Sequence, residues 1–217
     1  MSSLVGNAVR PAAAVRRHWW KRPLDLVFCI VLAPIAAPLA LIIWLVVRIR
    51  LGAPATFRQA RPGLNGQIFT LIKFRTMRDA CDENGEPLPD EKRLTSLGRF
   101  LRSTSLDEVP ELWNILTGAM TLVGPRPLLV EYMPLYSAKH QRRHLVRPGL
   151  TGWAQINGRN NLSWPDKLDL DVWYVDNCSP WLDLRILLMT PLRVLKRDGI
   201  SRPGHATVEK FSGYGNS

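Results

Sequence analysis

The sequence predicts an α+β fold that is mainly helical, with irregular loops and a few short strands. Three patterns indicate it: an uncharged apolar run near the N-terminus, one strand-like alternation, and helical periodicity in much of the second half. The 217 residues favour one domain joined to a membrane segment. We expect a flexible segment at 1–20, a membrane helix at 21–50, a cytoplasmic portion packed on the membrane at 51–210, and a poorly ordered tail at 211–217.

Positive charge dominates the composition, with 29 Lys and Arg residues against 18 Asp and Glu residues and a net charge of +11. Such an excess is typical of proteins that meet nucleic acid, an anionic membrane face or phosphorylated substrates. Cys29, Cys81 and Cys178 have no metal-ligand spacing and form no C-x-x-C pair. We therefore expect free thiols in, or facing, a reducing compartment.

The apolar run Leu26–Val47 contains no charged residue and, at ~1.5 Å per helical residue, is long enough for the ~30 Å hydrocarbon core of a bilayer. A straight transmembrane helix is one interpretation. Pro34 and Pro38 favour another, because proline removes a backbone donor and bends a helix. Both flanks are also basic, which favours the cytoplasmic side for each; the cations are Arg16, Arg17, Lys21, Arg22, Arg48, Arg50, Arg58 and Arg61. We predict a re-entrant helix broken at Pro34, with both ends on the cytoplasmic face.

The segment Ile68–Met77 alternates as a strand does, which places Lys73 and Arg75 on one face. These two cations form either a solvated strand edge or a clamp for phosphate.

Helical patterns cover 94–116, with an interruption at Pro110, and 128–144. The segment Trp181–Arg197 sets leucines on one face against arginines and lysines on the other. That pattern predicts an amphipathic helix lying in the membrane interface, although a core-packed helix has a similar pattern.

Asp107 and Glu108 form the best candidate site. Ser105 and Glu108 also fit a capping box at a helix start, which would explain Glu108 without catalysis. In either case Asp107 lies near a helix N-terminus, where the positive end of the dipole keeps a carboxylate ionised. An ionised aspartate can attack phosphorus, and paired carboxylates can hold Mg²⁺. We predict Asp107 and Glu108 as catalytic residues and as metal ligands.

A phosphorylated substrate would bring several negative charges to this site, and cations must neutralise them. Arg126 stands in the turn 124–127, which two prolines stiffen. We predict five substrate-binding cations on strand faces, turns and loops: Lys73, Arg75, Arg102, Arg126 and Arg159.

Several motifs, taken together, resemble those of one family. They are KRPLD at 21–25, QARPG at 59–63, KFRTM at 73–77, RLTSLGRFLRSTSLDEVPEL at 93–112, MTLVGPRPLL at 120–129 and RHLVRPGLTGWAQINGRN at 143–160. With them, nearly the whole chain resembles the monotopic phosphoglycosyl transferases of bacterial glycoconjugate pathways. The ending GISRPGHATVEKFSG at 199–213 is most similar to small members that transfer phospho-di-N-acetylbacillosamine in protein glycosylation.

The resemblance implies a UDP-sugar donor and undecaprenyl phosphate as acceptor, with Mg²⁺ required and Mn²⁺ able to replace it. It implies a ping-pong reaction: Asp107, of an Asp107–Glu108 dyad, attacks the phosphate bearing the sugar and expels UMP, and the acceptor then takes the phospho-sugar. It also implies membrane lipids and downstream glycosyltransferases as partners, at the cytoplasmic face of the bacterial inner membrane. Family members often have serine before the helix-breaking proline, whereas this chain has Ala33 before Pro34.

Three other interpretations stay open. A nucleic-acid-binding protein would explain the net charge of +11 but not the apolar run, so we expect no nucleic-acid partner. A non-catalytic membrane scaffold would need neither Asp107 nor the loop cations. A transferase in which the lipid phosphate attacks the donor directly would form no covalent intermediate.

Overall fold

The computed structural model describes residues 18–158, 162–196 and 210–214. Its helices are α2 (Lys21–Leu51), α3 (Asp90–Arg93), α4 (Ser96–Ser103), α5 (Glu111–Leu116), α6 (Ala138–Gln141), α7 (Trp153–Ile156), α8 (Trp164–Asn177) and α9 (Pro180–Lys196). Short 3-10 helices are η1 (Leu64–Gly66), η2 (Leu106–Glu108), η3 (Val130–Leu135) and η4 (Arg142–Leu145). The strands are β1 (Thr56–Pro62), β2 (Ile68–Phe74), β3 (Thr121–Val123) and β4 (Gly149–Thr151). The predicted class, mainly helical α+β, is confirmed.

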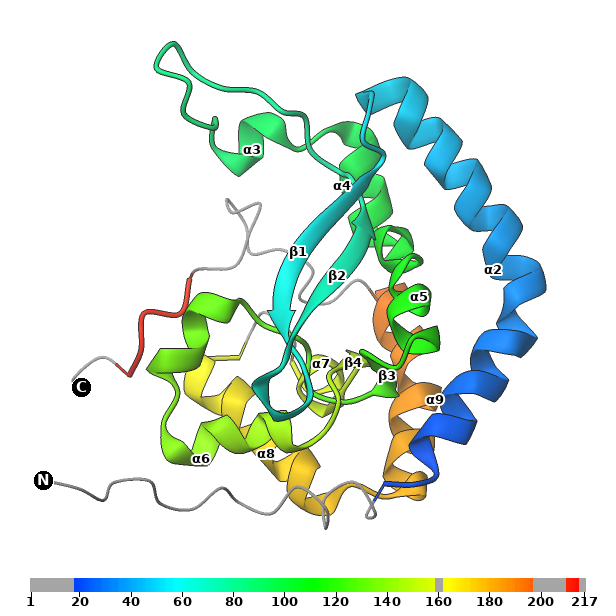
Figure 1. The fold of residues 1–217 in the computed structure, drawn as a ribbon, viewed down its shortest axis with the longest axis vertical. Coiled ribbons are helices and arrows are strands. Elements are labelled where there is room, and N and C mark those ends of the chain that lie inside the picture. The colour runs from blue at the N-terminus through cyan, green and yellow to red at the C-terminus, as the bar shows by residue number, and fades with distance from the viewer. Residues whose placement is uncertain (1–17, 159–161, 197–209, 215–217) are drawn as a thin grey trace, which may run out of the picture.

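The long helix α2 is apolar enough to cross a membrane by length and composition, and only 17% of its most apolar window is buried in the protein. The helix continues through Pro34 and Pro38, so the predicted break at Pro34 is not formed. Figure 1 shows α2 bowed around the body of the molecule. Proline removes a backbone donor and its ring clashes with the preceding turn, and a helix that continues through proline relieves this by bending. The re-entrant path through a membrane stays a prediction.

The start of α2 is fastened to the body by three charged side chains. Lys21 Nζ donates to Val123 O at 2.8 Å and to Tyr174 Oη and Asp183 Oδ2, each at 2.6 Å. Arg22 donates to the carbonyls that end α5, and Asp25 accepts hydrogen bonds at the start of β3. Lys21 and Arg22 therefore bind protein groups rather than serve as free flanking cations, which weakens the charge argument for topology.

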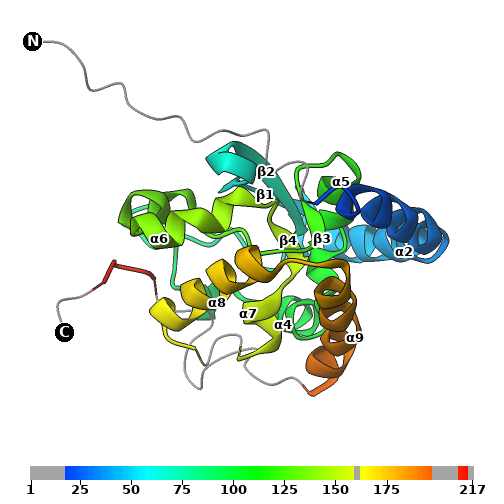
Figure 2. The ribbon, with the colours of Figure 1, turned by 90° about the horizontal axis from the view of Figure 1, so that it is seen from below.

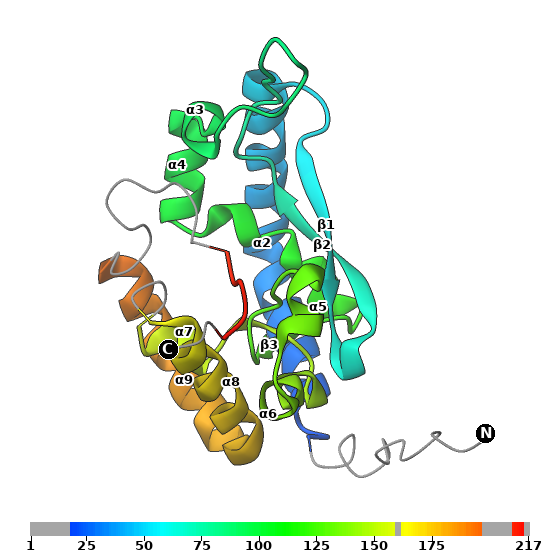
Figure 3. The same ribbon diagram turned by 90° about the vertical axis from the view of Figure 1, so that its left-hand side faces the viewer.

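The other end of α2 also packs on the body. Ile43 and Val47 are buried with Ala55, Phe74 and Leu101, in a cluster that joins the helix to β2 and α4. Figure 3 shows α2 running along the length of the body between these two attachments. The helix therefore contacts the same domain near both of its ends.

Two small sheets position the loops around the site. β1 and β2 pair antiparallel, which confirms the predicted strand over 68–74, and β3 and β4 pair in parallel. A Cβ at Gly149 would lie 2.1 Å from the nitrogen of Gly124, so only glycine permits this close approach of two backbones. Figure 2 shows α7, α8 and α9 grouped on one side of the β3–β4 pair.

Two of the predicted helical stretches are divided into shorter pieces. The stretch 94–116 forms α4, η2 and α5, because Ser105 adopts a left-handed φ of 57° that ends the first helix. The stretch 128–144 forms η3, α6 and η4. Pro134 lies inside η3. The Ser137 side chain caps α6 by accepting from His140 N, so a new helix begins there.

Helix α9 matches the predicted amphipathic helix, and its outer face exposes Trp181, Leu184, Leu188 and Leu192. Its placement in a membrane interface stays a prediction.

The chain end differs from the predicted tail. Phe211 is 4% exposed and packs with Tyr132, Tyr136 and Leu168, because aromatic rings on η3 and α8 leave a site that it fills. Most of the predicted flexible segment 1–20 lies outside the described residues.

Candidate active site

Four charged side chains from four elements meet beside the β1–β2 pair. Lys73 Nζ, on β2, lies 2.6 Å from Glu108 Oε1 of η2 and 3.0 Å from Glu111 Oε1 of α5. Arg126, in the turn after β3, also pairs with Glu108 Oε1. The structure therefore brings together Lys73, Glu108 and Arg126, which are far apart in sequence. Glu111 belongs to it and was not predicted, although its position three residues after Glu108 is the helical spacing that places two side chains on one face.

The dyad is carried by the 3-10 turn η2. Ser105 makes no side-chain cap hydrogen bond there, and the Glu108 carboxylate turns to Lys73 and Arg126 instead. The capping-box interpretation is therefore wrong, because both cations outcompete a backbone donor for the carboxylate. Helix α5 starts only at Glu111, so Asp107 lies outside the first turn of that helix, and the expected dipole effect that would keep Asp107 ionised has no basis there.

Burial and neighbouring charge shift the pKa values of the three carboxyl groups in different directions. Burial alone would raise the pKa of Glu108, but Arg126 and Lys73 more than offset it and lower that pKa to about 2. Burial, with the charge of Glu108, raises the pKa of Glu111 to about 7. The pKa of Asp107 is raised by burial and by Glu108, against the opposing effects of Lys73, Arg126 and Arg102. Glu108 is therefore a fixed anion, whereas Glu111 titrates near neutral pH.

Asp107 differs from its neighbours in having no partner. It is 8% exposed, yet within the described part of the chain its carboxylate forms no hydrogen bond and no ion pair. The Asp107 oxygens are not among the fully buried polar atoms that lack a hydrogen bond, so they keep some contact with solvent. Asp107 is therefore the group in this cluster that is left available for chemistry.

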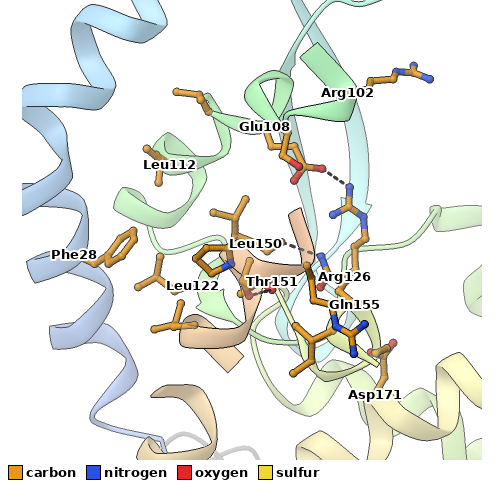
Figure 4. Close-up of a pocket in the computed structure, with 18 of the residues that line it drawn as sticks. Phe28, Arg102, Glu108, Leu112, Leu122, Arg126, Leu150, Thr151, Gln155 and Asp171 are labelled. Atoms are coloured by element: carbon orange, nitrogen blue, oxygen red, sulfur yellow. Dashed lines mark hydrogen bonds and ion pairs between the residues drawn. The ribbon is translucent and has the colours of Figure 1, made fainter. Parts of the chain in front are cut away.

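A cavity of about 550 Å³ opens beside Glu108 (Figure 4), and Asp107 is not among the residues that line it. Its charged residues include Arg102, Glu108, Arg126 and Asp171, which lie on one side of the cavity. Its apolar side is built from α2, α5, β3 and α9, and includes Phe28, Leu32, Leu112, Leu122, Leu187 and Pro191. One continuous space thus joins a cluster of charges to the inner face of the apolar helix α2.

The remaining predicted cations fall in three different places. Arg102 lines the cavity and donates from Nε to Thr76 Oγ1 at 3.0 Å. Arg75 is not brought into the cluster: it pairs with Asp79 and donates to carbonyls at the end of α2. The strand ends at Phe74, so the alternation that would align Arg75 with Lys73 stops one residue too early. Arg159 lies outside the described residues.

The sequence predicts Arg61 as a flanking cation of the membrane helix, but the structure places it beside the site. It donates to Pro127 O at 3.2 Å, and burial together with Arg126 lowers its pKa to about 10. Its place in the QARPG motif at 59–63 was the available signal.

The donor set fits Mg²⁺ only in part. Mg²⁺ often takes one or two carboxylates and completes its shell with water and substrate phosphate. The carboxylate of Asp107 has no partner, and both ion pairs of Glu108 use the same oxygen, so donors remain. Among the described residues, however, no three His, Cys, Asp or Glu side chains are grouped to hold a metal by themselves. A metal here would need phosphate oxygens from a substrate.

Comparisons with known proteins identify the family of this chain. The profile of the family described as bacterial sugar transferase matches residues 16–197. The uncharacterized sugar transferase EpsL of Bacillus subtilis is 54% identical over 196 residues, 90% of this chain and 97% of the relative. The undecaprenyl-phosphate galactose phosphotransferase of Salmonella typhimurium is 37% identical over 82% of this chain and 41% of its own length. A UDP-glucose:undecaprenyl-phosphate glucose-1-phosphate transferase of Caulobacter vibrioides is 38% identical over 82% of this chain and 70% of the relative.

The chain thus spans nearly all of the Bacillus relative but less than half of the Salmonella one. The names of these three relatives specify galactose, glucose or no sugar, so the similarity to transferases of phospho-di-N-acetylbacillosamine stays a prediction. With a profile match over most of the chain and a relative above 50% identity, this chain belongs to the bacterial sugar transferases and is a phosphoglycosyl transferase.

Proposed function

We propose that this enzyme transfers a sugar 1-phosphate from a UDP-sugar to undecaprenyl phosphate, through a covalent intermediate on Asp107. The observation that carries the proposal is the Asp107 carboxylate, 8% exposed and without a hydrogen bond or ion pair within the described residues, next to Glu108, which lines a cavity that is charged on one side and apolar on the other. Relatives with 37% and 38% identity are named for the transfer of a sugar phosphate to the same lipid carrier.

The reaction divides into two displacements at one phosphorus atom. An Asp107 carboxylate oxygen attacks the phosphorus that bears the sugar, and the bond to the bridging oxygen breaks, so UMP leaves with the electron pair. An oxygen of undecaprenyl phosphate then attacks the same phosphorus, and the carboxylate of Asp107 is released unchanged. Both displacements concentrate negative charge at the reacting phosphate. Lys73 and Arg126, which pair with Glu108, supply positive charge that offsets it.

Glu108 and Asp107 would also hold Mg²⁺, together with diphosphate oxygens of the donor. When bound, such a cation supplies charge neutralisation at the reacting phosphate. Lys73 keeps Glu108 oriented, since its ammonium contacts both Glu108 and Glu111. Arg102, which is half-buried near Asp107, adds a further positive charge to the donor side of the cavity.

The apolar side of the cavity suits the lipid acceptor. Phe28 and Leu32 come from α2, and Leu187 and Pro191 from α9, the two helices whose outer faces expose many apolar side chains. An acceptor with a charged phosphate and a hydrocarbon chain needs such a two-sided space. Its phosphate would be costly to bury against apolar side chains, and its hydrocarbon chain gains nothing from charged ones.

We also propose that α2 enters the membrane and returns on the cytoplasmic face. Support comes from its two attachments, because Lys21 and Val47 both pack on one domain. A helix that crossed the bilayer straight would place those ends on opposite sides. Single cysteines at Ala12 and Ala53, in a background without Cys29, Cys81 and Cys178, test this with a membrane-impermeant thiol reagent on intact cells. Labelling at neither site is expected; labelling at Ala12→Cys alone would indicate a straight span.

The activity test uses purified enzyme in detergent or nanodiscs with Mg²⁺, undecaprenyl phosphate and a panel of UDP-sugars. The panel includes UDP-galactose, UDP-glucose and UDP-di-N-acetylbacillosamine, and UMP release is measured. Release of one UMP per enzyme without the acceptor, with label retained on a peptide containing Asp107, is expected. UMP release that always requires the acceptor, with no labelled protein, would instead support direct attack by the lipid phosphate.

Chelation provides a second test of the same site. Excess EDTA should stop UMP release, and added Mg²⁺ or Mn²⁺ should restore it. Unchanged rates in chelator would remove the metal from the proposal while leaving the covalent route intact.

A further inference from the structure

The C-terminal strap, residues 210–214, is held by two aromatic anchors. Phe211 is buried, with its ring centroid 5.4 Å from that of Trp164 and 6.0 Å from that of Tyr136, which it stacks against. Tyr214 Oη contacts His140 Nδ1, and the two rings stack at 5.4 Å. The strap therefore lies on η3, α6 and α8, where Figures 1 and 3 show it in red.

A short series of contacts leads from the strap to the catalytic cluster. Tyr136, which stacks on Phe211, also lies 5.7 Å from the guanidinium carbon of Arg143. Arg143 is almost completely buried and donates to Arg126 O at 2.7 Å. The same guanidinium pairs at 2.7 Å with Asp171, which lines the cavity. Phe211 is thus separated from the Arg126 backbone by two side chains.

The turn that carries Arg126 depends on such contacts for its orientation. It is a connection without regular structure, held by Gly149 N donating to Pro125 O, by Arg61 donating to Pro127 O, and by Arg143 donating to Arg126 O. The Arg126 side chain must stay aligned with Glu108, and small misplacements of such groups reduce catalysis strongly.

We propose that the strap is a positioning element for the reaction: through Phe211, Tyr136 and Arg143 it keeps the turn 124–127 in the orientation that directs Arg126 to Glu108. This inference rests on the proposed function for its kinetic consequence. Neither Phe211 nor Tyr136 touches the reacting atoms, so both act through Arg126.

The test compares the wild type with Phe211→Leu, Tyr214→Phe and a chain that ends at Glu209. Lys210→Ala is the matched control, since Lys210 belongs to the strap but its side chain is 81% exposed. The kcat for UMP release should fall roughly tenfold in Phe211→Leu, with KM for the UDP-sugar changing less, and Lys210→Ala should match the wild type. Hydrogen exchange should accelerate at Gly124 and Arg126, which carry the only amide hydrogens of the turn because its other two residues are proline.

A double-mutant cycle distinguishes positioning from general destabilisation. In an Arg126→Lys background, Phe211→Leu should cost a much smaller factor in kcat, because the group that the strap positions is already changed. Equal losses in both backgrounds, or wild-type kcat and turn exchange in the folded truncated chain, would overturn the proposal. If the wild type releases no UMP with any UDP-sugar, the proposed function fails, whereas faster exchange of the turn in Phe211→Leu still supports the positioning contact.

Discussion

The base of α2 and the catalytic cluster both contain buried charges, but only one of them is completely paired. All three hydrogens of the Lys21 ammonium have protein acceptors, on Val123, Tyr174 and Asp183. In the cluster, Lys73 and Arg126 pair with Glu108, while the adjacent carboxylate of Asp107 has no partner among the described residues. Burial of charge is therefore common to both regions. What distinguishes the cluster is a largely buried carboxyl group, that of Asp107, which has no hydrogen bond or ion pair within the described residues and stands next to Glu108 at the cavity.

The largest expected effect separates the two regions through activity. Asp107→Asn should reduce UMP release by at least roughly a thousandfold, because it removes the nucleophile with almost no change in volume. The melting temperature in detergent should stay close to the wild type, since the carboxylate makes no hydrogen bond within the described structure.

A buried aspartate at the other region provides the control. Asp25→Asn should lower the melting temperature, because Asp25 accepts from Thr121 Oγ1 and from Leu122 N, yet turnover per folded molecule should persist. Normal turnover in Asp107→Asn would contradict both the mechanism and the distinction between the regions.

The next effect is on stability. Lys21→Met should cost about 3–5 kcal/mol of unfolding free energy, because it leaves Asp183 buried and without its counter-ion. The measurement is denaturant-induced unfolding in micelles, with exposed Arg48→Met as the control. Replacing both partners, Lys21→Met with Asp183→Leu, should recover part of the loss. If the double variant is no more stable than the single one, the pair is not the source of the cost.

Glu111→Gln should reveal a titrating group within the cluster. The pKa of Glu111 is raised to about 7 from 4.5, so the folded protein binds more protons than the unfolded chain between those values. Stability contributed at this position is therefore lost as pH rises through that window. The free energy of unfolding of Glu111→Gln should equal that of the wild type below pH ~4.5 and exceed it by up to roughly 3 kcal/mol above pH ~7. The measurement is denaturant-induced unfolding of both proteins at pH 5 and pH 8. The same stability difference between them at both pH values would rule out the titration.

The smallest effect concerns the cation that the structure moves away from the site. Arg75→Met should cost about 1–2 kcal/mol of stability, through lost hydrogen bonds to the end of α2, and leave kcat near normal. Lys73→Met, two residues earlier, should instead reduce turnover at least about tenfold. Equal kinetic losses in the two variants would return Arg75 to the substrate-binding group.

The sequence was informative where local patterns and chemistry agree. The strand at 68–74 and the helix α9 follow from periodicity. The need to neutralise phosphate pointed to Lys73 and Arg126, but only the fold shows that they meet at Glu108. The division of 94–116 was not predictable by periodicity, because it depends on one left-handed residue, Ser105.

Long-range pairing was the other source of error. Arg61 and Lys21 look like flanking cations in sequence, whereas the fold buries them against Pro127 and Asp183. The strap was missed for the same reason. Nothing local to Phe211 indicates that rings from η3 and α8 surround it.

The attachment of Lys21 also has a consequence for biosynthesis. Its partners Val123, Tyr174 and Asp183 lie 102, 153 and 162 residues later in the chain. At synthesis rates of roughly 5–20 residues per second, α2 is complete on the order of 7–26 s before Asp183 leaves the ribosome. During that interval the charges at its start are without these protein partners. In the topology proposed above, α2 can therefore enter the membrane before the groups that hold its first residue have been made.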